Sequence, residues 1–175
     1  MNMELIAQII IALLPAAAVV AVVYIMIKKS GEKDIANLSL QLKKERQKFF
    51  LEPRVDAYQR IVLLLERINP HNLVMRLHNP KASAVAFQAE LLQNIRNEYD
   101  HNVAQQIFIS PQAWEMVKKS KEETIKIINI AAKQMDEKAT STDLSSKIFE
   151  LVAELDELPT DITIQQLKKE LQRLF

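Results

Sequence analysis

The chain has 175 residues, with 23 Lys+Arg against 22 Asp+Glu, six prolines, no cysteine and a single glycine, Gly31. One glycine excludes the glycine-rich phosphate loops and disfavours a fold built from β-hairpins. The lack of cysteine excludes disulfides, thiolate zinc sites and a cysteine nucleophile.

The first predicted element is a transmembrane helix over residues 5–27. These 23 residues carry no formal charge, and a helix of that length reaches about 34 Å, enough for a hydrocarbon core about 30 Å thick. A cleaved signal peptide is the alternative, because residues 16–18 are alanines, but no positive charge precedes the apolar run. Lysines follow it, so the positive-inside rule places residues 1–4 outside and everything after Lys28 in the cytoplasm. The sequence thus predicts a single-pass signal anchor in the bacterial inner membrane.

Four side chains are predicted to lie at the membrane boundary. Tyr24 falls where aromatic rings favour the lipid–water interface, and the three lysines would meet anionic headgroups: Lys28, Lys29 and Lys33. Membrane lipid is therefore one predicted partner.

Residues 28–52 are predicted to form a charged juxtamembrane stalk helix. A thin apolar stripe runs along it at helical spacing: Ile35, Leu38, Leu42 and Phe49. The stripe could pair two stalks, but its heptad continuation places Glu45 and Glu52 in the same seam, which argues against a long coiled coil. Small residues four apart in the preceding helix, such as Ala17 and Ala21, would let another helix approach closely. Besides membrane lipid, a second copy of the chain is therefore a predicted partner, in a homo-oligomer.

Residues 53–175 are predicted to fold as a cytoplasmic helical domain. Apolar residues recur there at helical spacing, and helix-capping residues precede prolines at Asn69–Pro70, Asn79–Pro80 and Ser110–Pro111. Thr142 and Thr160 are further N-cap candidates. Pro53 and Pro159 are predicted to interrupt helices, and residues 136–141 are predicted to be flexible. The fold class is all-α, with a transmembrane helix, a stalk helix and a bundle of about five helices.

The charge balance bears on the partners. Residues 1–29 hold two Lys and one Glu, which leaves 21 positive and 21 negative side chains in residues 30–175. A nucleic-acid-binding domain is usually net basic, so no nucleic-acid partner is predicted. Four arginines could form an anion-binding face, but acidic residues lie among them, so ion pairs within the chain are the preferred interpretation: Arg54, Arg60, Arg67 and Arg76.

One pattern is typical of a metal site. Glu98 and His101 form a Glu-x-x-His pair, which places both side chains on one face of a helix, as in di-iron four-helix proteins. The other histidines, His71 and His78, have apolar residues three positions before them, so the second motif is missing. No catalytic residue and no cofactor are predicted, and a metal site at Glu98 and His101 is the alternative.

Three segments carry a resemblance to a known family: LEPRVDAYQRIVLLLERINPHNL (51–73), IRNEYDHNVAQQIFISPQAWEMVKKSKEE (95–123) and LKKELQRLF (167–175). On these the chain resembles an uncharacterised family of short, N-terminally membrane-anchored helical proteins from Bacteroidota. The resemblance implies an inner-membrane protein with a helical cytoplasmic domain, and it brings no catalytic residues with it.

The predicted function is a non-enzymatic, membrane-tethered interaction or scaffold module that docks a protein partner or oligomerises. Two alternatives stay open. One is a metal-dependent enzyme that uses Glu98 and His101, and the other is a ligand-sensing domain coupled to a membrane complex.

Overall fold

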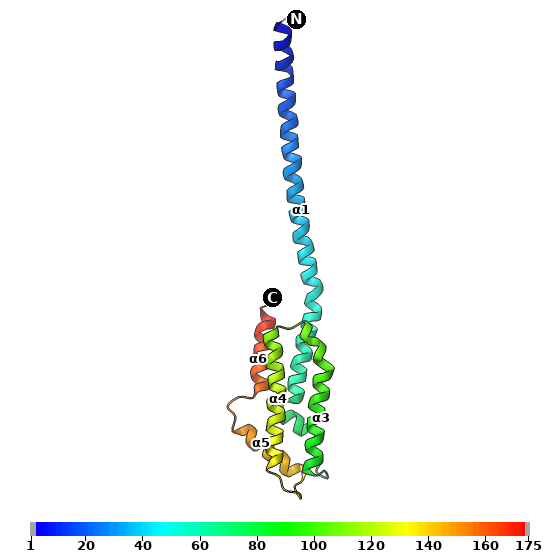
Figure 1. Ribbon diagram of the computed structural model, residues 1–175, viewed down its shortest axis with the longest axis vertical. Helices are drawn as coiled ribbons and strands as arrows, with labels where there is room; N and C mark the ends of the chain where they lie inside the picture. Colours follow the sequence, from blue (N-terminus) through cyan, green and yellow to red (C-terminus); the bar gives the residue numbers. More distant parts are fainter. Residues whose placement is uncertain (1–2, 174–175) are drawn as a thin grey trace. The chain divides into compact units, whose positions relative to one another are not determined.

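The computed structural model describes residues 3–173, and only the helical backbone of residues 4–12, 14, 16 and 47. Its regular structure is helical apart from one isolated bridge between Ser83 and Thr140. The helices follow in the order α1 (Met3–Ile68), α2 (Pro70–Leu77), α3 (Ala84–Asn102), the 3-10 helix η1 (Val103–Ile107), α4 (Pro111–Lys133), α5 (Ser141–Ala153) and α6 (Pro159–Gln172) (Figure 1). The predicted all-α class is confirmed for the described residues.

Helix α1 contains three elements that are predicted separately from the sequence: the transmembrane helix, the stalk helix and the first helix of the cytoplasmic domain. It runs without interruption for 66 residues, through Pro15 and Pro53. The predicted break at Pro53 is therefore wrong. A proline inside a helix costs about 3 kcal/mol, and the burial of Ala57, Tyr58 and Ile61 in the turns that follow offsets this cost.

By its internal contacts the chain divides into two units between Phe50 and Leu51, within α1. The described part of the first unit is one helix. Its large apolar side chains lie exposed from Leu13 to Phe50.

The prediction of a transmembrane helix over residues 5–27 is overturned. No helix of the described residues is long and apolar enough to cross a membrane. The single-pass signal anchor and the inner-membrane location are therefore wrong as predicted. Of the extracytoplasmic segment predicted for residues 1–4, residues 1 and 2 lie outside the described residues, and α1 begins at Met3.

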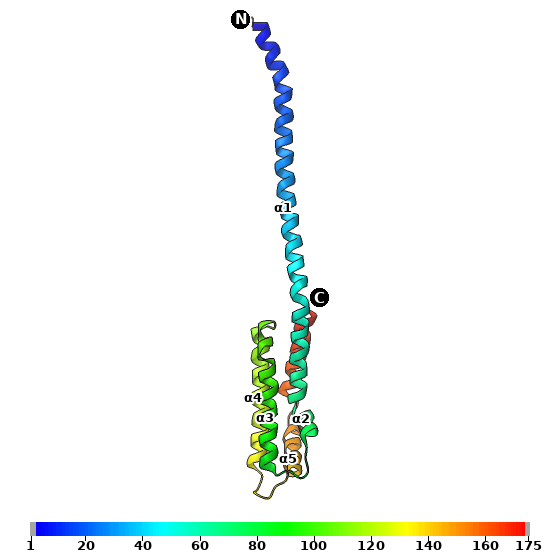
Figure 2. The same cartoon turned by 90° about the vertical axis from the view of Figure 1, so that its right-hand side faces the viewer.

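The second unit is a two-layered bundle. One layer holds α3 and α4, and the other holds the end of α1 with α2, α5 and α6 (Figure 2). Helix α4 packs against α3, α5 and α6. The arrangement is that of a four-helix bundle in which two positions are each filled by two successive helices, α1 then α2 and α5 then α6.

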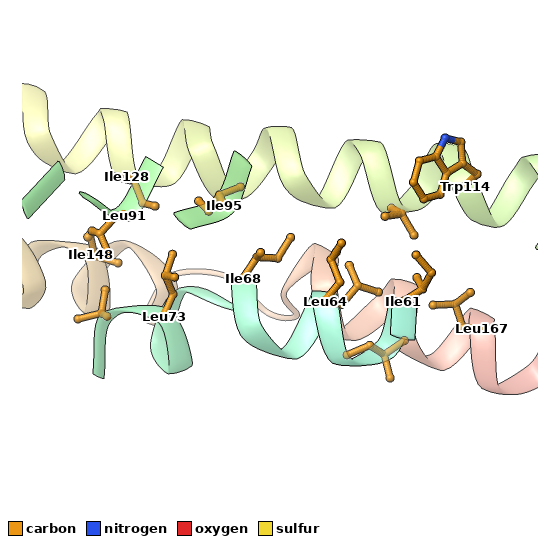
Figure 3. Packing of buried hydrophobic residues seen from close by; sticks show 14 of the residues in the cluster. Ile61, Leu64, Ile68, Leu73, Leu91, Ile95, Trp114, Ile128, Ile148 and Leu167 are labelled. Atoms are coloured by element: carbon orange, nitrogen blue, oxygen red, sulfur yellow. The ribbon is translucent and has the colours of Figure 1, made fainter. Parts of the chain in front are cut away.

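A single hydrophobic core fills the space between the layers. Figure 3 shows its side chains between the ribbons, with Ile61, Leu64 and Ile68 on α1 and Trp114 on α4. Every α-helix of the bundle contributes fully buried side chains, among them Leu73, Leu91, Ile128, Ile148 and Leu167. The apolar spacing read from the sequence is what places these residues on one face of each helix.

The segment predicted to be flexible, residues 136–141, is anchored at its end. The Ala84 N–H donates to the Ala139 carbonyl at 2.9 Å, and the Ser141 N–H donates to the Ala82 carbonyl at 3.0 Å. Ser141 itself is fully buried. The α2–α3 and α4–α5 connections therefore hold one another at one end of the bundle.

Candidate functional site

Glu98 and His101, the alternative metal pair, lie on α3, where each side chain has a partner within the chain. Arg67 on α1 donates from Nε to Oε1 of Glu98 at 2.6 Å, and its Nη2 lies 2.6 Å from the same oxygen in the ion pair. The Glu98 side chain is only 16% exposed. His101 Nδ1 lies 2.7 Å from the carbonyl oxygen of Asn97, one turn earlier in the same helix. Glu98 is thus engaged in a structural ion pair.

No third ligand joins this pair in the part of the chain that the structure describes, where no group of three or more His, Cys, Asp or Glu side chains could hold a metal ion. The other two histidines lie against aromatic rings, His71 at 5.1 Å from Phe149 and His78 edge-on to Phe87 at 6.0 Å. The structure does not bring the three histidines together at one site.

Two of the four arginines form ion pairs within the described chain, as the ion-pair interpretation predicts. Arg60 Nε lies 2.7 Å from Oδ2 of Asp56, one turn earlier, and Arg67 binds Glu98. Arg76 donates to Oδ1 of Asn94 at 3.4 Å and to the carbonyl oxygen of Arg67 at 3.1 Å. Three of these guanidinium groups are therefore occupied within the chain.

A polar network that the sequence does not reveal joins α1, α4 and α6. The hydroxyl of Tyr58, a residue that is only 2% exposed, donates to Oε2 of Glu170 at 3.1 Å, and Ser110 Oγ donates to Oε1 of the same carboxylate at 2.8 Å. Burial, and after it the negative charge of Glu170, raises the pKa of Tyr58 above 10.0. These residues lie far apart in the sequence, so no local spacing points to the network.

An apolar groove of about 310 Å³ lies beside this network, between α1 and α6. Its apolar walls are Val62 and Leu63 on α1 with Leu167 and Leu171 on α6. Leu63 is largely exposed at the rim. A smaller hollow of about 200 Å³ lies between α4 and α6, next to the hydroxyl of Ser120.

The first unit presents the most exposed apolar surface that the structure describes. The four predicted boundary residues lie on it with exposed side chains: Tyr24, Lys28, Lys29 and Lys33. Further along α1, the predicted stalk stripe is equally uncovered, with exposed fractions from 48% for Leu42 to 74% for Phe49. Leu13, Ala17, Val20, Ala21 and Tyr24 lie next to one another along one side of the helix. The small-residue pair Ala17 and Ala21 therefore lies on this open face.

Comparison with known proteins gives one match. Residues 4–174 match DUF7935, a family of unknown function, and the chain belongs to that family. No curated protein and no solved structure matches the chain. The predicted resemblance to an uncharacterised family is confirmed, while the origin in Bacteroidota stays a prediction.

Proposed function

We propose that this member of DUF7935 is a non-enzymatic interaction module, in which the exposed first unit of α1 assembles with other protein chains and the bundle forms the folded body. The observation that carries the proposal is the row of large, uncovered apolar side chains along this helix: Ile35, Leu38, Leu42 and Phe49.

The energetics favour a covered state. Burying one such side chain contributes about 1.5 to 3 kcal/mol relative to leaving it in water. Soluble proteins rarely expose contiguous apolar patches unless these patches bind something. A single helix also gains most of its stability in water from tertiary packing, and the described side chains of this unit show none. A partner helix would supply the missing contacts.

The bundle, in contrast, has its own closed core. None of the buried side-chain N and O atoms that the structure describes lacks a hydrogen-bond partner. Its apolar core side chains come from every α-helix of the unit. This contrast supports a division of roles, with assembly assigned to the first unit.

The test is the mass of the full chain in solution, measured by light scattering over a range of concentrations. Leu38→Lys places a charge on the apolar stripe, and we expect it to shift the chain to a smaller species. Leu40→Lys is the matched control, because both leucines are 56% exposed while Leu40 lies on the opposite face of the helix. A full chain that stays monomeric at every concentration and cross-links to no partner in cells would refute the proposal.

The two alternatives stay predictions. A metal enzyme centred on Glu98 and His101 requires stoichiometric metal in the purified protein, which elemental analysis measures. A ligand sensor requires a compound that raises the melting temperature reproducibly in a thermal-shift screen.

A further inference from the structure

Eight positions on the first unit form one continuous seam. Alternate spacings of four and three residues connect them, the spacing that aligns side chains along a coiled-coil interface: Tyr24, Lys28, Gly31, Ile35, Leu38, Leu42, Glu45 and Phe49. All are exposed except Gly31, which is half-buried. The seam spans about 38 Å of helix.

The seam is complementary to itself when reversed. If two copies lie antiparallel with the symmetry axis between positions 36 and 37, every seam residue meets a seam residue of the other copy. Lys28 then faces Glu45, Tyr24 faces Phe49, and Gly31 faces Leu42. The centre is formed by Ile35 against Leu38. Each charged residue of the seam thus meets its opposite charge, twice in the symmetric pair.

The parallel arrangement lacks this complementarity. With the two copies in register, Lys28 would face Lys28 and Glu45 would face Glu45, and like charges at an interface are repulsive. Gly31 would face Gly31 and leave a gap in the packing. Only the reversed arrangement uses both charges and fills the gap.

From this charge and size matching we infer that the seam binds a second copy of this chain as an antiparallel helix pair. The inference rests on the proposed function and specifies its partner. The structure leaves room for it, since a Cβ added at Gly31 would meet nothing within 4 Å, so the side chain of Leu42 can approach the helix backbone there. The positions that flank the seam also bring no like charges together, because Asp34 lies near Gln41 and Glu32 near Ser39 of the other copy.

Charge exchange in the full chain tests the pairing. Lys28→Glu alone and Glu45→Lys alone each place like charges opposite one another, so each should raise the dimer Kd at least about tenfold. The double variant, Lys28→Glu with Glu45→Lys, should restore the wild-type Kd, and Lys29→Glu, outside the seam, should leave it unchanged. In a parallel dimer a single exchange only replaces one like-charge pair by another. Failure of the double variant to recover the dimer would therefore overturn the inference.

Cross-linking tests the orientation independently. The chain has no cysteine, so introduced thiols are unique. Under mild oxidation a mixture of the Tyr24→Cys and Phe49→Cys proteins should form a disulfide-linked dimer, and neither protein should do so alone. Cross-linking of the Tyr24→Cys protein with itself would show a parallel pair. That result would refute the antiparallel seam while leaving the proposed assembly role intact, whereas a chain that is monomeric throughout would refute both.

Discussion

Glu170 is the meeting point of three helices because its carboxylate accepts hydrogen bonds from both Tyr58 and Ser110. Ser110 also caps α4, since its Oγ accepts the Ala113 N–H at 3.0 Å. The start of α4 and the end of α6 are thus fixed to the same point on α1. This is also the edge of the groove between α1 and α6.

Removing the Tyr58 hydroxyl should weaken this point without opening a cavity. Tyr58→Phe keeps the buried ring and deletes one hydrogen bond, so we expect the free energy of unfolding to fall by about 1 kcal/mol. Urea denaturation at neutral pH measures the change. An unchanged unfolding midpoint would show that the hydroxyl contributes nothing to stability.

The same residue should make stability depend on alkaline pH. The pKa of Tyr58 is raised above 10.0, first by burial and then by Glu170, so the folded chain holds the phenolic proton more tightly than the unfolded chain does. This contribution is complete below the unfolded pKa and is lost as the pH rises from there through the folded pKa. Above about pH 10 the wild type should lose stability more steeply than Tyr58→Phe. Parallel pH profiles would contradict the shift.

The ion pair between Arg67 and Glu98 gives a test of the structural role of Glu98, which the sequence offers only as an alternative metal ligand. Because Arg67 is 43% exposed, the pair should contribute only about 0.5 to 1 kcal/mol. A double-mutant cycle with Arg67→Met and Glu98→Gln measures this coupling. A coupling energy of zero would mean that Glu98 is free for another role.

Sequence spacing finds partners within one helix but misses those on another. The pair of Asp56 and Arg60 follows from their separation of four residues. The choice of Glu98 as the partner of Arg67, and of Glu170 as the partner of Tyr58, depends on how α3 and α6 pack against α1. No local pattern contains that information.

At the scale of elements, two of the three helix starts that the sequence predicts from a capping residue followed by proline are confirmed. Asn69 caps α2 and Ser110 caps α4, as expected. Asn79–Pro80 instead forms a turn, and Ser83 caps α3. Thr160, a predicted cap, is buried inside α6 and accepts a hydrogen bond from Asn69 at 3.3 Å. Its tertiary contact, which the sequence does not show, outweighs its local preference.

Helix α5 gives a direct test of a corrected boundary. Thr142 was the predicted cap, whereas Thr140 is the residue whose hydroxyl accepts the Asp143 N–H while the Asp143 carboxylate accepts the Thr140 N–H at 2.8 Å. Thr140→Ala should lower the free energy of unfolding by about 1 kcal/mol, and Thr142→Ala should change it far less. Thermal denaturation of both variants separates the two. Equal losses would contradict the observed cap.

At the scale of the whole molecule, the two units differ in how their described apolar side chains are covered. The second unit has a core of its own, and its all-α class and most of its helical faces follow from apolar spacing. The first unit has the same helical periodicity and an apolar run, from which the sequence predicted a lipid environment. An apolar run indicates only that covering this surface is more favourable than leaving it in water. It does not specify what covers that surface, so the location read from it was wrong while the helix itself is present.

This difference predicts a concentration-dependent pattern of amide hydrogen exchange along the full chain. If the seam is covered by a second copy, amides in residues 24–49 should exchange slowly at high protein concentration and faster on dilution below the dimer Kd. Amides of the same helix in the core, around Ile61 and Leu64, should exchange at a rate independent of concentration, because their protection comes from contacts within the chain. Mass spectrometry of the peptides at two concentrations measures both regions in one experiment, with the second region as an internal control. Equal protection of residues 24–49 at both concentrations, in a chain that light scattering shows to dissociate, would mean that the helix is stable alone and that its apolar face is not covered by self-association.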